Sequence, residues 1–131
     1  MGLALAGDIT ITSEAAKFNL VFGPNLGIIV DMGASWFLPN LICRDRANGL
    51  ALLGEDLPAA TAKDWRLIWN CVRADQLLKE AQTIAELLVD GPPIDLKAVV
   101  KAHDRSTANT LSEQLEYEKK RSECSLTSAM F

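Results

Sequence analysis

The spacing of hydrophobic and polar positions changes near residue 72. Before that point, short apolar runs are separated by turn residues, and they predict a mixed α/β part. Polar and β-branched residues alternate over 8–12, which predicts a strand. A second short strand is predicted over 16–22, ended by Gly23-Pro24-Asn25, and a last strand over 67–72.

Three helices are predicted between these strands. The first covers residues 33–42, and Pro39 should distort or end it because proline has no N–H to donate. The second covers 44–55, with Gly54 as its C-cap. The third covers 58–65 and begins at Pro58.

Residues 26–30, LGIIV, form a brief apolar run that we expect to be buried, as a strand or a loop. Asp31 ends the run, three residues ahead of Ala34 at the predicted helix start. Two interpretations of Asp31 follow. As a helix cap it would stabilise the helix by about 1 kcal/mol. As a catalytic base it would lie in a dry pocket, where desolvation suits a carboxylate to proton transfer.

Beyond residue 72 the pattern is helical. Asp75 is positioned to cap a helix in which apolar residues recur from Leu77 to Leu88, and Gly91-Pro92-Pro93 ends it. A further helix is predicted over 94–104. Thr110 and Glu113 form a capping box for a last helix, which has Leu111 and Leu115 on its apolar side.

Composition excludes several classes of protein. The chain has 131 residues, a net charge of −4 and no basic stripe, so a nucleic-acid partner is not expected. No apolar run reaches the ~18 residues that a membrane span needs, and the N-terminus does not resemble a signal peptide. Three scattered cysteines without CxxC and a single histidine, His103, predict no disulfide framework and no metal site, and they favour a cytoplasmic protein.

Three segments together carry a resemblance to a known family. They are D-x-G-x-S-W at 31–36, L-A-L-L-G-E-x-L at 50–57 and A-x-x-W-x-L-I-W at 62–69. The chain resembles the second half of the enoyl-CoA hydratase/isomerase (crotonase) superfamily, and within it the isomerases that convert ring-epoxidised phenylacetyl-CoA to its oxepin form. The implied fold class is α/β, the C-terminal portion of a crotonase-type (ClpP/crotonase) spiral fold, mostly helical with a few short strands. Residues 1–72 would be a partial core around Asp31, and 73–131 a helical assembly region.

The resemblance also implies a chemistry. In this family two backbone N–H groups hold the thioester oxygen of an acyl-CoA and stabilise the enolate, while a carboxylate moves the proton. Asp31 matches that carboxylate, and Gly33, Trp36 and Phe131 match substrate-contacting positions, although Trp36 is equally explained as a core residue. Trp65 and Trp69 are expected to be core or helix-packing residues. Coenzyme A enters only as part of the substrate, and no other cofactor is implied.

Isomerisation is favoured over hydration. The hydratases of the family use two glutamates, whose positions fall here at Gly2 and near Phe22. Neither residue is acidic. Water addition by the two-glutamate mechanism is therefore not expected.

The chain departs from the family in two respects. Both oxyanion donors come from the first half of the family domain, one of them from a glycine that would fall immediately before Met1. Because losing one such donor costs ~10²–10³ in rate, we expect these 131 residues by themselves not to turn over substrate. In addition, Cys43 and Arg66 stand where the family has glycine, and Val30 where it has proline. If position 66 needs a positive φ, Arg66 is strained by ~1 kcal/mol or more.

Two functions follow from the resemblance. The first is an acyl-CoA isomerase that transfers a proton beside a CoA thioester, in catabolism of the phenylacetate or fatty-acid type. The second is a non-catalytic structural fragment that associates through residues 73–131. Family members usually form trimers or paired trimers, so a homo-oligomer is expected in either case.

Overall fold

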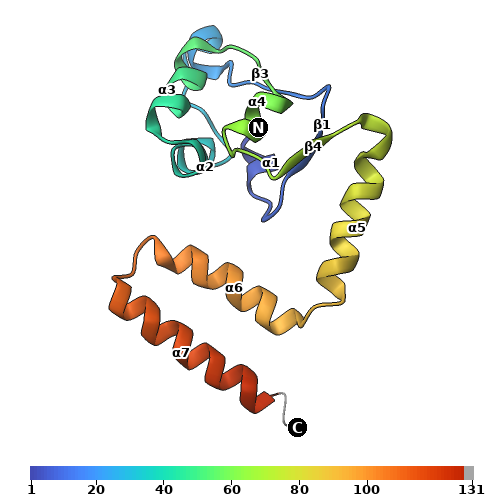
Figure 1. Cartoon of the computed structure of the whole chain (residues 1–131). Coiled ribbons are helices and arrows are strands. Elements are labelled where there is room, and N and C mark those ends of the chain that lie inside the picture. The colour runs from blue at the N-terminus through green and yellow to red at the C-terminus, as the bar shows by residue number, and fades with distance from the viewer. Residues whose placement is uncertain (129–131) are drawn as a thin grey trace. The chain divides into compact units, whose positions relative to one another are not determined.

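A computed structural model describes residues 1–128, except for the side chains of residues 93–95 and 124–128. The chain forms two compact units (Figure 1), residues 1–81 and the residues from 82 onward. The boundary falls within helix α5 (Leu77–Val89). Each unit is described below by itself.

The first unit combines short strands with four helices that precede α5. In chain order its elements are α1 (Gly2–Leu5), β1 (Ile11–Ser13), β2 (Lys17–Phe18), a π-helical turn (Phe22–Leu26), α2 (Ala34–Ile42), α3 (Arg44–Leu53), β3 (Leu57–Pro58), α4 (Ala59–Asp64), β4 (Asn70–Val72) and a 3₁₀ turn (Ala74–Gln76). Strands β1 and β4 pair in parallel, with Ile11 opposite Asn70 and Ser13 opposite Val72. Strands β2 and β3 pair antiparallel, with Phe18 opposite Leu57.

The predicted strands exist but are shorter than expected. Each strand pairs with one other strand among the described residues. The paired segments are only two or three residues long. The helix predictions for α2, α3 and α4 are confirmed. Pro39 does not end α2, which runs on to Ile42. Gly54 caps α3 with φ +66°, and its N–H donates to the Leu50 carbonyl at 3.2 Å.

The core of this unit lies between α2, α3, α4 and the short strands. Its buried side chains are Leu5, Phe18, Leu20, Ala34, Leu38, Ile42, Ala47, Leu50, Leu57, Ala59, Ala62, Leu67 and Ile68. The expected burial of residues 26–30 is wrong, because Ile28 is 54% exposed and Ile29 83% exposed. Leu26 is exposed as well, and within this run only Val30 packs against the core.

Two residues at positions where the resemblance implies glycine have a backbone conformation that suits glycine. Cys43, between α2 and α3, has φ +68°, and Arg66, after α4, has φ +65°. The conditional expectation of strain at position 66 is therefore confirmed. A side chain in this region costs roughly 1–2 kcal/mol.

Asp75 does not cap α5. It lies inside the 3₁₀ turn that precedes the helix, and its carboxylate accepts hydrogen bonds from Arg73 Nε at 3.1 Å and Nη2 at 3.0 Å. The capping prediction for Asp75 is wrong because this ion pair occupies both carboxylate oxygens.

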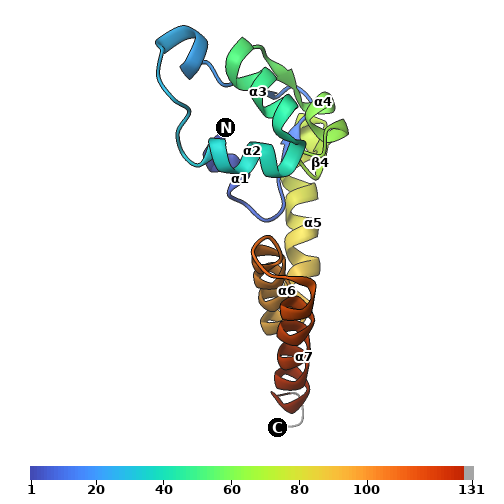
Figure 2. The same ribbon diagram turned by 90° about the vertical axis from the view of Figure 1, so that its left-hand side faces the viewer.

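The second unit contains α6 (Pro93–Ser106) and α7 (Leu111–Ser128), which pack side by side (Figure 2). The capping box is confirmed: Glu113 Oε2 accepts from the Thr110 N–H at 2.8 Å, and Thr110 Oγ1 accepts from the Glu113 N–H at 3.4 Å. The Thr110 N–H and hydroxyl hydrogen bonds lower the pKa of Glu113 below its ordinary value. Across the described residues, none of the helices is long and apolar enough to cross a membrane.

Candidate functional site

Asp31 lies in the loop between the π-helical turn and α2, and it is exposed. The expectation of a dry pocket is therefore wrong for the described residues, because none of them covers this side chain. Its backbone carbonyl accepts the Ala34 N–H at 3.0 Å, which starts the helix. Its carboxylate has no hydrogen bond or ion pair with any described residue. The capping interpretation is therefore wrong, since α2 follows Gly33 and no side chain caps its free N–H groups.

The backbone after Asp31 is held in an unusual conformation. Met32 and Gly33 both have positive φ, +50° and +77°. For methionine this conformation is costly, and such strain tends to persist at functional sites. A Cβ on Gly33 would also lie 2.8 Å from Phe37 Cε2, so this position requires glycine.

Gly2, the first residue of α1, packs directly against this loop. A Cβ at Gly2 would lie 2.4 Å from the Met32 carbonyl oxygen and 3.0 Å from that of Asp31. With the loop in this position, Gly2 cannot be replaced by a larger residue. The N-terminal end of α1 and the Asp31 loop are therefore brought into contact.

Apolar side chains on the Asp31 loop and the first turn of α2 are open to solvent. Trp36 is 59% exposed, and Ile28, Ile29 and Met32 are exposed as well. The Trp36 ring meets Phe37 edge to face, with centroids 5.2 Å apart at 88°. The interpretation of Trp36 as a core residue is wrong.

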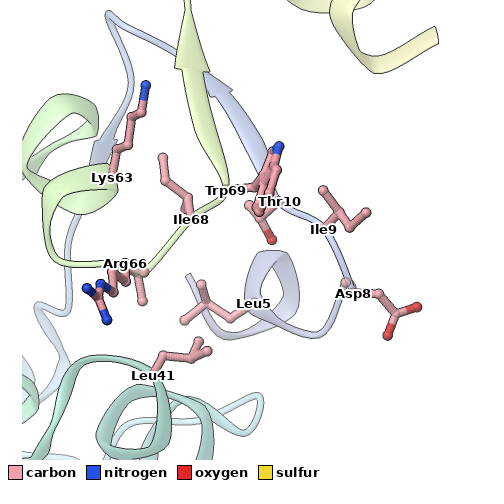
Figure 3. Close-up of a pocket in the computed structure, with 11 residues that line it drawn as sticks. Leu5, Asp8, Ile9, Thr10, Leu41, Lys63, Arg66, Ile68 and Trp69 are labelled. Carbon is pink, nitrogen blue, oxygen red and sulfur yellow. The ribbon is translucent and has the colours of Figure 1, made fainter. Parts of the chain in front are cut away.

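The other two tryptophans differ from each other. Trp65 packs against the core as expected, with Arg46 4.9 Å from its ring centroid. Trp69 is exposed, so its predicted core role is wrong. It lines a cleft of about 480 Å³ at the starts of β1 and β4, with Lys63 and Arg66 on one side and Asp8 on the other (Figure 3). Asp31 does not line this cleft.

A polar cluster fixes β2 to the segment after α3. Asp56 accepts hydrogen bonds from Asn19 Nδ2 at 2.8 Å and Lys17 Nζ at 3.0 Å, and these contacts lower its pKa. Asn19 also donates to the Gly54 carbonyl at 3.0 Å. This cluster connects β2 to the segment after α3 and does not include Asp31, the carboxylate of the D-x-G-x-S-W segment.

The structure brings Asp31, Gly33 and Trp36 together on one loop and helix start, whereas Phe131 lies outside the described residues. Sequence reasoning missed two features of this place: the close approach of Gly2 and the left-handed Met32. A glycine at the start of a helix was the available signal for the first; nothing in the sequence signals the second. Among the described side chains, no three His, Cys, Asp or Glu residues are grouped to hold a metal ion.

Known proteins match the chain along nearly its whole length. The family model described as enoyl-CoA hydratase/isomerase matches residues 1–129. The 1,2-epoxyphenylacetyl-CoA isomerase of Escherichia coli (strain K12) is 42% identical over 117 residues, which are 89% of this chain and 44% of that protein.

Solved structures agree. An enoyl-CoA hydratase from Polaromonas sp. JS666 is 30% identical with a TM-score of 0.89, over 95% of this chain and 48% of that one. A Thermobifida fusca relative assigned as an enoyl-CoA hydratase, solved with acetoacetyl-CoA, is 26% identical with a TM-score of 0.92, over 97% of this chain and 49% of that one. The chain thus spans about half the length of these relatives. Its motifs, its α/β fold and these matches agree: the chain belongs to the enoyl-CoA hydratase/isomerase family, of whose crotonase fold it represents about half.

Proposed function

We propose that this chain carries the proton-transferring half of an acyl-CoA isomerase site, with Asp31 as the group that moves the proton. The observation that carries the proposal is the unpaired, exposed carboxylate of Asp31 between the strained Met32–Gly33 backbone and exposed apolar side chains. A carboxylate with no hydrogen-bond partner among the described residues is free to accept a proton, and the apolar side chains offer a surface for an acyl group.

Two observations support an isomerase rather than a hydratase. Position 2, where the family's hydratases have a glutamate, is a glycine with no room for a side chain against the Met32 carbonyl. Position 22 is Phe22, which has no acidic group. The site therefore has one carboxylate for the chemistry, and isomerisation needs one group that removes a proton and returns it elsewhere.

The substrate class is an acyl-CoA, and coenzyme A takes part only as its carrier. The E. coli relative is named for 1,2-epoxyphenylacetyl-CoA, and the T. fusca relative was solved with acetoacetyl-CoA. Trp36 offers an aromatic surface to the acyl group, and Gly33 is an exposed residue beside Asp31. Phe131, by resemblance, would contact the CoA portion. These residues fit the isomerisation of a ring epoxide or of a double bond. Such a reaction would belong to cytoplasmic catabolism of the phenylacetate or fatty-acid type.

The proposed step conserves all atoms of the substrate. Asp31 takes a proton from the carbon beside the thioester, leaving an enolate whose oxygen the family's two backbone N–H donors stabilise. The first half of the family domain supplies those donors. The proton then returns to a different carbon of the substrate. With a ring epoxide, the enolate electrons first break an epoxide C–O bond, and the proton returns to a ring carbon, so in both cases Asp31 is regenerated as a carboxylate.

Deuterium incorporation at the carbon beside the thioester tests the proposal. The first half of the E. coli isomerase is joined in front of Met1, and acyl-CoA is incubated with this protein in D₂O. Asp31→Asn should lower the exchange rate by ~10²–10⁴, the usual contribution of a general base. Asp64→Asn, an exposed aspartate at the end of α4, is the matched control and should leave the rate within about twofold. Exchange that survives Asp31→Asn would sink the proposal.

A second candidate is a non-catalytic role in assembly. Leu111 and Leu115 on α7 and Val99 on α6 are exposed apolar residues, as an unfilled interface requires. This candidate predicts a homo-oligomer, a trimer or a hexamer, that forms without acyl-CoA. Light scattering tests this candidate by comparing the parent with the double variant Leu111→Lys/Leu115→Lys. The variant should be smaller than the parent, and a monomeric parent would contradict the candidate.

A further inference from the structure

Gly2 is a buried residue at the place where α1 meets the Asp31 loop. A Cβ added to Gly2 would lie 2.4 Å from the Met32 carbonyl oxygen and 3.0 Å from that of Asp31. Carbon and oxygen atoms in close non-bonded contact are usually about 3.3–3.6 Å apart, so a methyl group at position 2 needs roughly 1 Å of movement. Either α1 or the loop would have to move.

Helix α1 is fixed to the rest of the first unit. The side chain of Leu5 is 4% exposed and belongs to the hydrophobic core. The Thr10 hydroxyl donates to the Ala4 carbonyl at 3.1 Å, which connects the helix to the segment that leads into β1. Moving α1 would disturb the packing of the core, and close-packed cores resist such shifts. The loop is therefore the part that we expect to move.

The loop that carries Asp31 is largely exposed. Ile28 and Ile29, which precede Asp31, are 54% and 83% exposed. On its other side, the Asp31 carbonyl accepts the Ala34 N–H at 3.0 Å, at the start of α2. A shift of the Asp31 and Met32 carbonyls away from α1 would move the backbone from which the Asp31 carboxylate projects.

We propose that Gly2 is a positioning residue: the absence of a side chain at position 2 sets where the Asp31 carboxylate lies. Gly2 touches no reacting atom and acts through the backbone of Asp31 and Met32. The inference rests on the proposed function, because it concerns the group that moves the proton. Since a misplacement of about 1 Å can cost ~10²-fold in rate, the size of residue 2 controls the rate of proton transfer.

Deuterium exchange into phenylacetyl-CoA tests the inference in the protein that carries the first half of the E. coli isomerase in front of Met1. Gly2→Ala should lower the exchange rate at saturating phenylacetyl-CoA by ~10²-fold, while the Kd for phenylacetyl-CoA stays within about threefold. Gly7→Ala is the matched control, since the nearest atom to a Cβ there is the Ala4 carbonyl oxygen at 3.8 Å. This control should leave the exchange rate within about twofold of the parent.

A double substitution separates positioning from a purely structural role. In a protein that already carries Asp31→Asn, Gly2→Ala should change the residual exchange rate by less than about twofold, because no carboxylate is left to displace. If the effects of Gly2→Ala and Asp31→Asn multiply instead, Gly2 acts on the fold or on substrate binding, and the inference is wrong. A Kd that weakens as much as the rate falls would also contradict it.

A measurement on the 131-residue chain does not depend on activity. Gly2→Ala should shift the amide NMR signals of residues 31–34 and leave those of α3 unchanged, whereas Gly7→Ala should leave residues 31–34 unchanged. Loss of the α3 signals would mean that the whole unit yields rather than the loop, and it would overturn the inference.

Two further results distinguish this inference from the proposed function. Signals of residues 31–34 that do not respond to Gly2→Ala, or an exchange rate within twofold of the parent, would overturn the inference alone. Exchange that survives Asp31→Asn, in a protein whose residues 31–34 do respond to Gly2→Ala, would contradict the proposed function.

Discussion

The two units of this protein are stabilised by different means. Every fully buried side chain of the hydrophobic core belongs to the first unit, between Leu5 and Ile68. In the second unit, none of the described side chains from residue 82 onward is fully buried. The α6–α7 pair depends on local contacts: the Thr110–Glu113 capping box, a hydrogen bond from Gln114 Nε2 to the Ala102 carbonyl at 3.0 Å, and Arg105 stacked 4.7 Å from the Tyr117 ring centroid.

This difference shows where each unit is open to partners. In the first unit, the buried side chains lie mainly on α2, α3, α4 and the short strands. The side chain of Asp31 and the outer edge of β1 have no covering element among the described residues. The second unit leaves most of its apolar residues exposed, because two helices alone cannot enclose a core. The first unit therefore carries the proposed proton-transfer site, and the exposed apolar side chains of the second unit are those on which the proposal of association rests.

The largest contrast should come from matched leucine truncations. Leu38→Ala removes a side chain that is 2% exposed, and it should lower the free energy of unfolding by about 2–5 kcal/mol. Leu115→Ala, on a half-exposed face of α7, should change it by less than about 0.5 kcal/mol. Urea unfolding measures both, and equal effects would mean that the second unit has a core of its own.

A pair of glycine substitutions separates backbone strain from crowding at the Asp31 loop. Gly33→Ala should destabilise the first unit by about 2 kcal/mol, because it adds a contact with Phe37 to the cost of positive φ. Gly27→Ala has a similar φ, +65°, and nothing within 4 Å, so it should cost about 1 kcal/mol. Unfolding midpoints that are equal for the two variants would contradict the close packing of Gly33 on Phe37.

The capping box gives an effect confined to the second unit. Thr110→Ala should lower the stability of α7 by about 1 kcal/mol, because it removes the side-chain partner of the Glu113 N–H. Ser112→Ala, inside the same first turn, is the control. Amide hydrogen exchange along α7 measures the change, and an effect that spreads to α2 or α3 would argue against independent units.

The smallest effect is a pH dependence of the same cap. The pKa of Glu113 is lowered in the folded chain, so its contribution is complete above the ordinary value of 4.5 and is lost as pH falls below it. Helicity measured by circular dichroism from pH 6 to pH 3 should fall less steeply in Glu113→Gln than in the parent. Glu116→Gln, a substitution on the same helix outside the capping box, should follow the parent curve. Superimposable curves for the parent and Glu113→Gln would rule out the cap as a contributor.

Local signals in the sequence predicted local structure well. The glycine cap of α3, the capping box of α7 and the existence of the helices from α2 to α7 depend on residues within one or two turns of each other. Helix α1 was not predicted. The strand lengths and the exposure of Ile28 and Ile29 depend on what packs against them from elsewhere in the fold, which their own pattern does not contain. Sequence therefore placed Asp31 on a loop ahead of a helix but could not predict its open surroundings.

The candidate site was predicted in part for the same reason. Asp31, Gly33 and Trp36 lie within six residues, so a short motif brings them together. Gly2 approaches the loop through tertiary packing of α1 on α2, and the only sign of this in the sequence is the glycine itself. The left-handed conformation of Met32 is imposed by the turn into α2, against the preference of methionine itself.

Reconstitution from two separate halves tests the central claim most directly. The 131-residue chain, the first half of the E. coli isomerase and their mixture are each incubated with acyl-CoA in D₂O, and deuterium at the carbon beside the thioester is measured. The account predicts exchange only in the mixture, and its loss when the chain carries Asp31→Asn. A mixture that forms the complex and exchanges equally fast with Asp31→Asn would contradict the assignment of Asp31 as the proton-transferring group.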